Sequence, residues 1–100
     1  VVTGVEKQGQ TVPSGYNLSQ NYPNPFNPVT NIHFSIPKDG NVSLKFYNML
    51  GKEVATYYDG FMKAGYYNAE FNGVNLSSGI YFYRLVAGSF TDTKKMILAK

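Results

Sequence analysis

The chain has 100 residues, enough for one domain, and it contains no cysteine, so neither disulfides nor thiolate metal sites can support its fold. Aromatic residues make up 16% and charged residues 15%, and the net charge is +3 with scattered lysines and one arginine, Arg84. This composition favours an all-β protein, and it speaks against a nucleic-acid binder, which would cluster Lys and Arg on one element.

The first 15 residues have the composition of a flexible linker, since they are rich in Gly, Ser, Thr and Gln and poor in apolar residues. The chain opens on Val1-Val2, without an initiator Met and without a signal peptide. No apolar run approaches the roughly 20 residues of a membrane span. We therefore expect a C-terminal piece of a longer protein, with residues 1–15 as a flexible linker that joins its upstream part to a domain over residues 16–100.

A proline-rich run, Leu18–Pro28, follows the linker. Pro23, Pro25 and Pro28 exclude a helix, because each lacks an amide proton and has a fixed φ. Each proline also pushes the preceding residue into extended geometry. The run predicts a stiff, exposed arm that lies outside the core, with a short edge strand near Tyr16 and Leu18 before it.

Two alternating runs come next, residues 32–36 and residues 42–46, separated by the turn sequence Pro37–Gly40. Alternation with period two is typical of half-buried strands, and the short turn predicts that these two form a hairpin. Residues 52–58 predict a third strand with Val54, Thr56 and Tyr58 facing the core. Residues 59–65 predict a loop.

The second half continues the same pattern. Residues 66–71 predict a strand, and residues 80–87 predict a central strand because both of its faces are apolar. Gly88-Ser89 predicts a two-residue turn into a last strand, residues 90–99, with Met96 and Leu98 on one face. About seven antiparallel strands with frequent turns indicate an immunoglobulin-like β-sandwich, and Leu76–Tyr81 indicates a tyrosine corner.

No constellation of catalytic or metal-ligating residues is present in the sequence. The single histidine, His33, lies in the middle of a strand and is expected on the surface. The six acidic residues are well separated and do not have calcium-loop spacing, and the glycines do not form a phosphate-binding loop. We expect a protein with no catalytic residue, no cofactor and no metal.

Tyrosines leave one alternative open. Tyr47, Tyr57 and Tyr66 could point outward and stack on sugar rings, as in a carbohydrate-binding module. Cross-strand aromatic pairing that supports the sheet explains the same residues. A sugar-binding or adhesive sandwich is therefore the second hypothesis for function, and a structural spacer is the third.

The chain from about residue 16 onward resembles the C-terminal sorting domains of the type IX (Por) secretion system. Three blocks carry the resemblance, which are Leu18–Pro28, Tyr47–Val54, and Leu76–Leu85 followed by Lys94–Ile97. The resemblance implies an immunoglobulin-like domain at the end of a secreted cargo, related to that of hook-capping proteins. It also implies passage from the periplasm through the outer-membrane translocon to the cell surface, and removal by a sortase-like peptidase.

The resemblance further implies roles for particular residues. The family's Pro-Asn-Pro falls on Pro23, Asn24 and Pro25, and its basic positions fall on Lys52 and on Lys94 or Lys95. Because these residues are expected on the surface, we predict that they contact the translocon, partly by adding backbone hydrogen bonds to an open edge of the last strand. For Gly51, Gly79 and Tyr81 a structural role in turns and packing is predicted.

Overall fold

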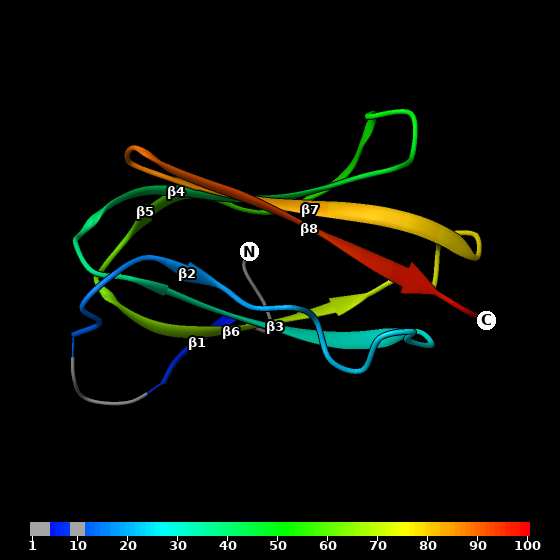
Figure 1. Ribbon diagram of the computed structural model, residues 1–100, viewed down its shortest axis with the longest axis horizontal. Helices are drawn as coiled ribbons and strands as arrows, with labels where there is room; N and C mark the ends of the chain where they lie inside the picture. Colours follow the sequence, from blue (N-terminus) through cyan, green and yellow to red (C-terminus); the bar gives the residue numbers. More distant parts are fainter. Residues whose placement is uncertain (1–4, 9–11) are drawn as a thin grey trace.

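Two four-stranded antiparallel sheets face each other in the computed structural model, which describes residues 12–100 and the backbone of residues 5–8 (Figure 1). The first sheet has the order β1 (Val5–Gln8), β6 (Gly65–Asn72), β3 (Val29–Ile36), β2 (Asn17–Leu18). The second has the order β5 (Glu53–Met62), β4 (Gly40–Tyr47), β7 (Gly79–Ala87), β8 (Phe90–Leu98). No helix occurs in these ranges. The predicted all-β sandwich is confirmed, and its arrangement is consistent with the immunoglobulin-like fold.

The predicted linker, residues 1–15, contains a strand. β1 pairs with β6 in an antiparallel register, with Val5 opposite Ala69 and Gln8 opposite Tyr66. Residues 1–4 and 9–11 of this segment lie outside the described residues.

The core lies between the sheets and is built from alternate residues of the central strands. Period-two alternation puts one face of each strand inward, so the buried residues follow the pattern that the sequence predicts. Phe46 of β4 stacks on Phe71 of β6 with ring centroids 4.0 Å apart, which joins the two sheets at their centre. Other large side chains of this core are fully buried as well: Ile32, Ile36, Leu44, Tyr83, Leu85 and Met96.

The hairpin predicted for residues 32–36 and 42–46 is wrong. β3 pairs with β2 and β6, whereas β4 pairs with β5 and β7, so the turn after Ile36 carries the chain from one sheet to the other. Alternation shows which face of a strand is buried. A hairpin within one sheet and a turn that crosses to the other sheet both leave the same alternating pattern. A short turn alone therefore does not settle which strands pair.

The predictions for residues 52–65 are also wrong in two respects. The strand runs on to Met62 and only Lys63-Ala64 connects it to β6, so residues 59–62 are not a loop. A register shift sets Leu44 opposite Tyr58 and Lys45 opposite Thr56, which leaves Tyr57 as the extra residue of a β-bulge. The bulge turns Tyr57 against Phe46 and Phe71, while Thr56 is exposed and does not face the core.

The β7–β8 hairpin agrees with the sequence. β7 is a central strand, and Gly88-Ser89 forms the turn, with Ala87 opposite Phe90 and a left-handed φ of 58° at Gly88. Met96 and Leu98 are buried together, as predicted. The tyrosine corner is present as well, because the Tyr81 hydroxyl donates a hydrogen bond to the Ser77 carbonyl at 2.6 Å.

Candidate recognition surface

The proline-rich arm is docked along both sheets. Its first part runs beside β3, where the Ser19 amide donates to the His33 carbonyl and Tyr22 and Asn31 exchange two backbone hydrogen bonds, all at 2.9 Å. The chain then crosses to the second sheet. There the Phe26 amide donates to the Ile97 carbonyl at 2.9 Å, and the Ala99 amide donates to the Phe26 carbonyl at 3.0 Å. The arm therefore closes the gap between β3 and β8.

Phe26 anchors the arm in the core, since its side chain is only 2% exposed. It packs edge-on against Phe71 and beside buried Gly73, where a Cβ would come within 3.2 Å of Leu98 and 3.4 Å of Phe26. The Gly73 amide also donates to the Pro28 carbonyl at 2.8 Å. The expectation that the arm lies outside the core is wrong, because Phe26 buries an aromatic ring that the sequence places among polar residues and prolines.

A buried polar cluster, consisting of Asn21, Thr30 and the Pro23 carbonyl, holds the bend of the arm. Asn21 and Thr30 are 2% and 0% exposed. The Asn21 amide Nδ2 donates to Thr30 Oγ1 at 3.0 Å and to the Pro23 carbonyl at 3.1 Å, and the Thr30 hydroxyl donates to the same carbonyl at 2.8 Å. Sequence analysis missed this cluster. The signal was present in Thr30, which shares its parity in β3 with Ile32 and Phe34.

The predicted recognition residues of the arm lie at its surface. Pro23, Asn24 and Pro25 are all exposed. The Asn24 side-chain oxygen accepts a hydrogen bond from the Ile97 amide at 2.9 Å, and Gln20 Nε2 donates to the Lys95 carbonyl at 2.6 Å. The arm and the end of β8 thus form one continuous surface.

The same contacts correct the prediction of an open edge. The arm already bonds backbone groups of Lys95 and Ile97 in β8 and of Ala99, which follows the strand. This end of the terminal strand is therefore not free to pair with another chain. Covering an edge in this way also protects a sheet from unwanted association.

Lys94 and Lys95 point to opposite faces of β8, because side chains alternate along a strand. Lys94 lies opposite buried Tyr83 in the register, is half-buried, and pairs with Asp92 at 3.9 Å. Lys95 lies opposite Phe82 on the outer face and is exposed. The structure therefore does not bring the two lysines together as one site.

The second block forms the β4–β5 loop, residues 48–52. Lys52 is exposed in this loop, and Gly51 has the predicted left-handed conformation with a φ of 82°. The third block leads into β7, where Gly79 has a φ of 155° and open space around it. The positive φ favours glycine at both positions, whereas space does not, because a Cβ would meet no atom within 4 Å at either one.

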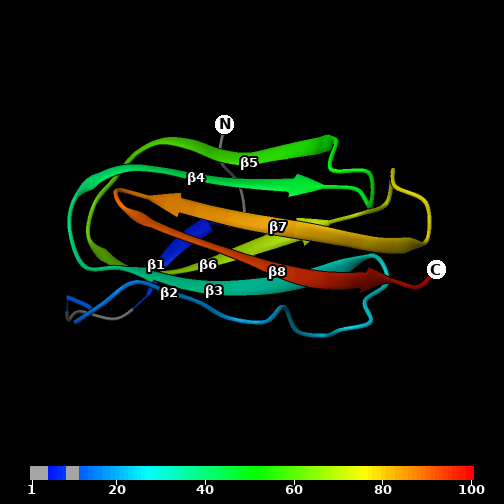
Figure 2. The ribbon, with the colours of Figure 1, turned by 45° about the horizontal axis from the view of Figure 1, so that its top comes forward.

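All three blocks meet at one end of the sandwich. Figure 2 shows the arm, the β4–β5 loop, the β6–β7 loop and the C-terminus at the same end, on the right of the view. The opposite end carries the turn between β3 and β4 and the β7–β8 turn. The predicted recognition residues at this common end are Pro23, Asn24, Pro25 and Lys52.

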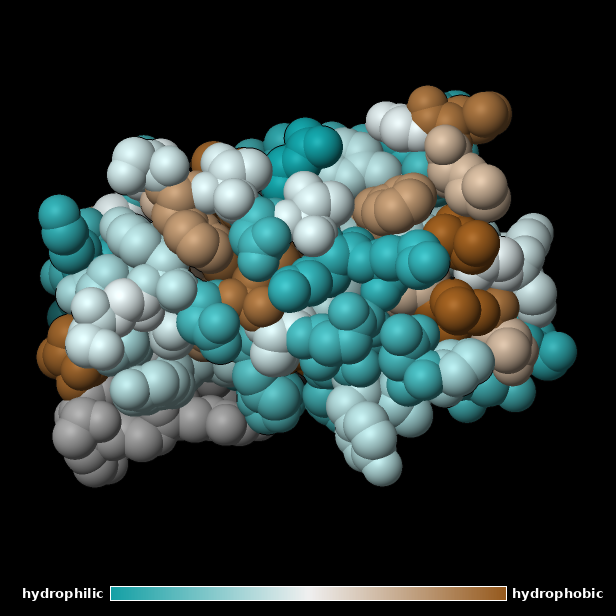
Figure 3. Space-filling view, viewed as in Figure 1, coloured by the Kyte–Doolittle hydropathy of each residue, from teal (hydrophilic) through white to brown (hydrophobic). Residues whose placement is uncertain are grey.

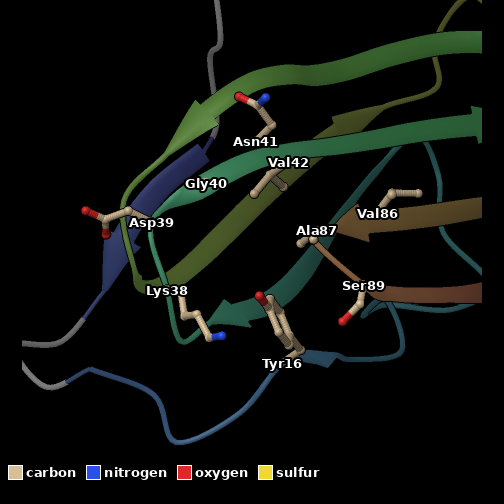
Figure 4. Close-up of a pocket in the computed structure, with 10 residues that line it drawn as sticks. Tyr16, Lys38, Asp39, Gly40, Asn41, Val42, Val86, Ala87 and Ser89 are labelled. Carbon is tan, nitrogen blue, oxygen red and sulfur yellow. The ribbon is translucent and has the colours of Figure 1, made fainter.

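A hollow with a volume of about 580 Å³ lies at the opposite end (Figure 4). Tyr16, Lys38 and Asp39 line it together with the first residues of β4 and the β7–β8 turn. Tyr16 also stacks on Phe90 with ring centroids 5.1 Å apart. None of the predicted recognition residues reaches this hollow.

Metal-ligating side chains are dispersed over the residues that the structure describes. His33 is exposed on β3, as predicted, and its backbone amide bonds to Ser19 Oγ at 3.0 Å. Across the described part of the chain, no three His, Asp or Glu residues come close enough to hold a metal ion. In the same part, no helix has the length and apolar character needed to cross a membrane.

The family comparison agrees with this geometry. Residues 20–99 match the family model of the secretion system C-terminal sorting domain. The chain belongs to this family. No curated protein and no solved structure matches it. The type IX sorting domain suggested by the three motif blocks is thus confirmed, and the family serves proteins that are secreted or displayed at the cell surface.

Proposed function

We propose that this sorting domain is a non-catalytic signal that directs an attached cargo from the periplasm through the outer-membrane type IX translocon. A sortase-like peptidase then removes the domain at the cell surface. One observation carries the proposal, namely that the arm, the β4–β5 loop and the C-terminus converge at one end of the sandwich. A translocon can read that end while the cargo leaves from the N-terminal side of the chain.

Exposure supports a contact role for part of this end. Pro23, Asn24, Pro25 and Lys52 all reach solvent. Hydrogen bonds between backbone amides and asparagine side chains hold the segments of Asn24 and Lys52 in place. A preordered surface loses little conformational entropy when a partner binds. The proposal therefore assigns partner recognition to these four residues, with Lys95 on the adjoining face of β8.

The test is to fuse the full chain behind a periplasmic reporter in a type IX-competent host and to measure the surface fraction of the reporter. We expect export of the reporter. Replacing Pro23, Asn24 and Pro25 with Ala should reduce export beyond what the change in melting temperature explains. A reporter that stays in the periplasm while the host exports its own cargo would contradict the proposal.

Deletion of Lys94 to Lys100 is a poor test, although the sequence alone suggests it. The deletion also removes Met96 and Leu98, which are 0% and 1% exposed, so a loss of export would reflect unfolding. Lys94→Gln and Lys95→Gln separate the charges from the core. We expect the Lys95 variant to export less and the Lys94 variant to behave like the original chain.

The sugar-binding alternative has less support. Stacking on a sugar requires open aromatic faces, but Tyr57 packs against the core and the Arg84 guanidinium covers the Tyr47 ring at 5.0 Å. Tyr66 lies 40% exposed on the other sheet. These three tyrosines therefore do not build a common platform.

A further inference from the structure

The β4–β5 loop presents two neighbouring apolar side chains to solvent. Leu50 is 92% exposed and Met49 is 68% exposed. Figure 3 shows hydrophobic side chains gathered at the tip of this loop, at the upper right. A single exposed leucine is ordinary on a protein surface. Two adjacent apolar side chains on a protruding tip form a knob that burial in a partner would stabilise.

The backbone of the loop is fixed, although its tip is exposed. Asn48 Oδ1 accepts hydrogen bonds from the amides of Leu50 at 2.9 Å and Lys52 at 3.0 Å. The Asn48 amide donates to the Lys52 carbonyl at 2.9 Å, and the Gly51 amide donates to the Asn48 carbonyl at 3.0 Å. The backbone that carries the apolar knob is therefore ordered before any partner arrives, which lowers the entropic cost of binding.

A hollow of about 270 Å³ adjoins the knob on the outer face of the second sheet. Met49 and Gly51 of the loop line it together with Tyr47, Phe82 and Arg84. The knob and the hollow thus belong to one surface with a projection and a recess.

Arg84 supplies a cation without an acidic partner in this hollow. Its guanidinium lies 5.0 Å from the Tyr47 ring centroid, and its Nε donates to Thr93 Oγ1 at 3.3 Å. Among the described residues no carboxylate pairs with Arg84, whereas Lys45 and Lys94 pair with Glu53 and Asp92. The ring and the hydroxyl orient the guanidinium and leave its terminal amino groups available to a carboxylate, which they can bind in bidentate geometry.

We propose that the knob and the Arg84 hollow together dock a protein of the secretion machinery. The partner receives Met49 and Leu50 in an apolar pocket and places a carboxylate against Arg84. This inference rests on the proposed sorting function. An acidic protein fits because Lys52 and Lys95 flank the surface as exposed cations and the chain carries a net charge of +3. Arginine and tyrosine, which line the hollow as Arg84 and Tyr47, are also enriched at binding hot spots.

Competition during export tests this inference. The full chain, produced free in the periplasm of a type IX-competent host, should block export of a reporter that carries the same chain. Leu50→Ser and Arg84→Gln should each raise the amount of free chain needed for half-blockage by about tenfold or more. Leu50→Met, which keeps the apolar surface, should compete like the original chain.

Two matched controls lie at the other end of the sandwich. Phe61→Ser removes an apolar side chain that is 58% exposed, and Lys38→Gln removes an exposed cation. Both should compete normally. All variants should keep the original melting temperature to within a few degrees, because each changed side chain is exposed.

The outcomes separate the inference from the proposed function. An original reporter that is never exported contradicts the sorting function itself. A reporter that is exported, with Leu50→Ser and Arg84→Gln competing normally, overturns the docking surface and leaves the sorting function intact.

Sedimentation with vesicles of phosphatidylcholine and phosphatidylglycerol tests whether the surface binds lipid instead of a protein. Binding to them that needs Arg84 but not Leu50, with unchanged competition, would assign the surface to anionic lipid and overturn the protein partner.

Discussion

Tyr81 fixes the entry into β7 through its hydroxyl, which donates to the Ser77 carbonyl at 2.6 Å while the residue is 8% exposed. Tyr81→Phe keeps the ring and removes this hydrogen bond. We expect a loss of about 0.5–1.5 kcal/mol in the free energy of unfolding, measured by urea denaturation. Tyr22→Phe is the control, because Tyr22 is 79% exposed. If the two substitutions changed the free energy of unfolding equally, the tyrosine corner would not stabilise the fold.

Thr30 tests the buried polar cluster at the bend of the arm. Thr30→Val keeps the shape of the side chain but leaves the Pro23 carbonyl and the Asn21 amide with one hydrogen bond fewer each. A buried polar group without its partner costs about 1–3 kcal/mol, so the free energy of unfolding should fall by that amount. Exposed Thr91→Val should leave it within about 0.5 kcal/mol. A stable Thr30→Val protein would show that solvent replaces these bonds.

Burial of Tyr83 gives the domain a limit of stability at alkaline pH. The side chain is 0% exposed, its hydroxyl donates to the Ser19 carbonyl at 2.7 Å, and burial raises its pKa well above the ordinary 10.0. Above about pH 10 the unfolded chain loses this proton while the folded chain keeps it, so stability falls as the pH rises. The slope for one tyrosine reaches about 1.4 kcal/mol per pH unit.

Tyr83→Phe should make this decline shallower, although the lost hydrogen bond lowers stability at neutral pH as well. Burial also raises the pKa of Tyr57 and of Tyr67, so part of the slope should remain. Urea denaturation between pH 8 and about pH 11 separates the change in slope from the constant offset. An identical slope in both proteins would show that Tyr83 does not control the alkaline transition.

At the scale of single elements, the sequence predicts burial better than pairing. Alternation in residues 32–36 and 42–46 identified the inward side chains, since burial depends on the local face of each strand. The choice of neighbouring strand depends on long-range contacts, so the β3–β4 connection was misread as a hairpin. The bulge at Tyr57 was missed for a related reason. The extra residue of a bulge changes which side chains of the strand face inward. The residue types at positions 55–58 do not show whether a bulge is present.

The arm shows the same limit of local reasoning. Its prolines exclude a helix and predict extended backbone, but the docking of Phe26 depends on β6 and β8, which lie far along the chain. Phe26→Ala should lower the free energy of unfolding by about 3–5 kcal/mol, as expected for a buried aromatic ring. Asn27→Ala, at the exposed neighbour, should change it by less than about 0.5 kcal/mol. A small effect of Phe26→Ala in thermal and urea unfolding would show that the arm is not part of the core.

At the scale of the whole molecule, the common end follows from counting strands. Two strands lie between the arm and the β4–β5 loop, two more precede the β6–β7 loop, and two more precede the C-terminus. Each passage of two antiparallel strands returns the chain to the end from which it started. The convergence of the three blocks could therefore be predicted from a correct strand order, but the contacts of the arm with β8 could not.

This polarity predicts different responses to insertions at the two ends. Gly-Ser inserted between Leu50 and Gly51 alters the common end, whereas Gly-Ser inserted between Gly88 and Ser89 lengthens an exposed turn at the opposite end. Exposed loops tolerate insertions, and hairpin loops of about 2–5 residues are common, so both proteins should fold with similar melting temperatures. Because the proposed function assigns recognition to the common end, only the first insertion should reduce the surface fraction of a fused reporter. Equal export of the two fusions, at equal stability, would contradict recognition at one end, since a partner that reads both ends or the sandwich faces would respond to either insertion.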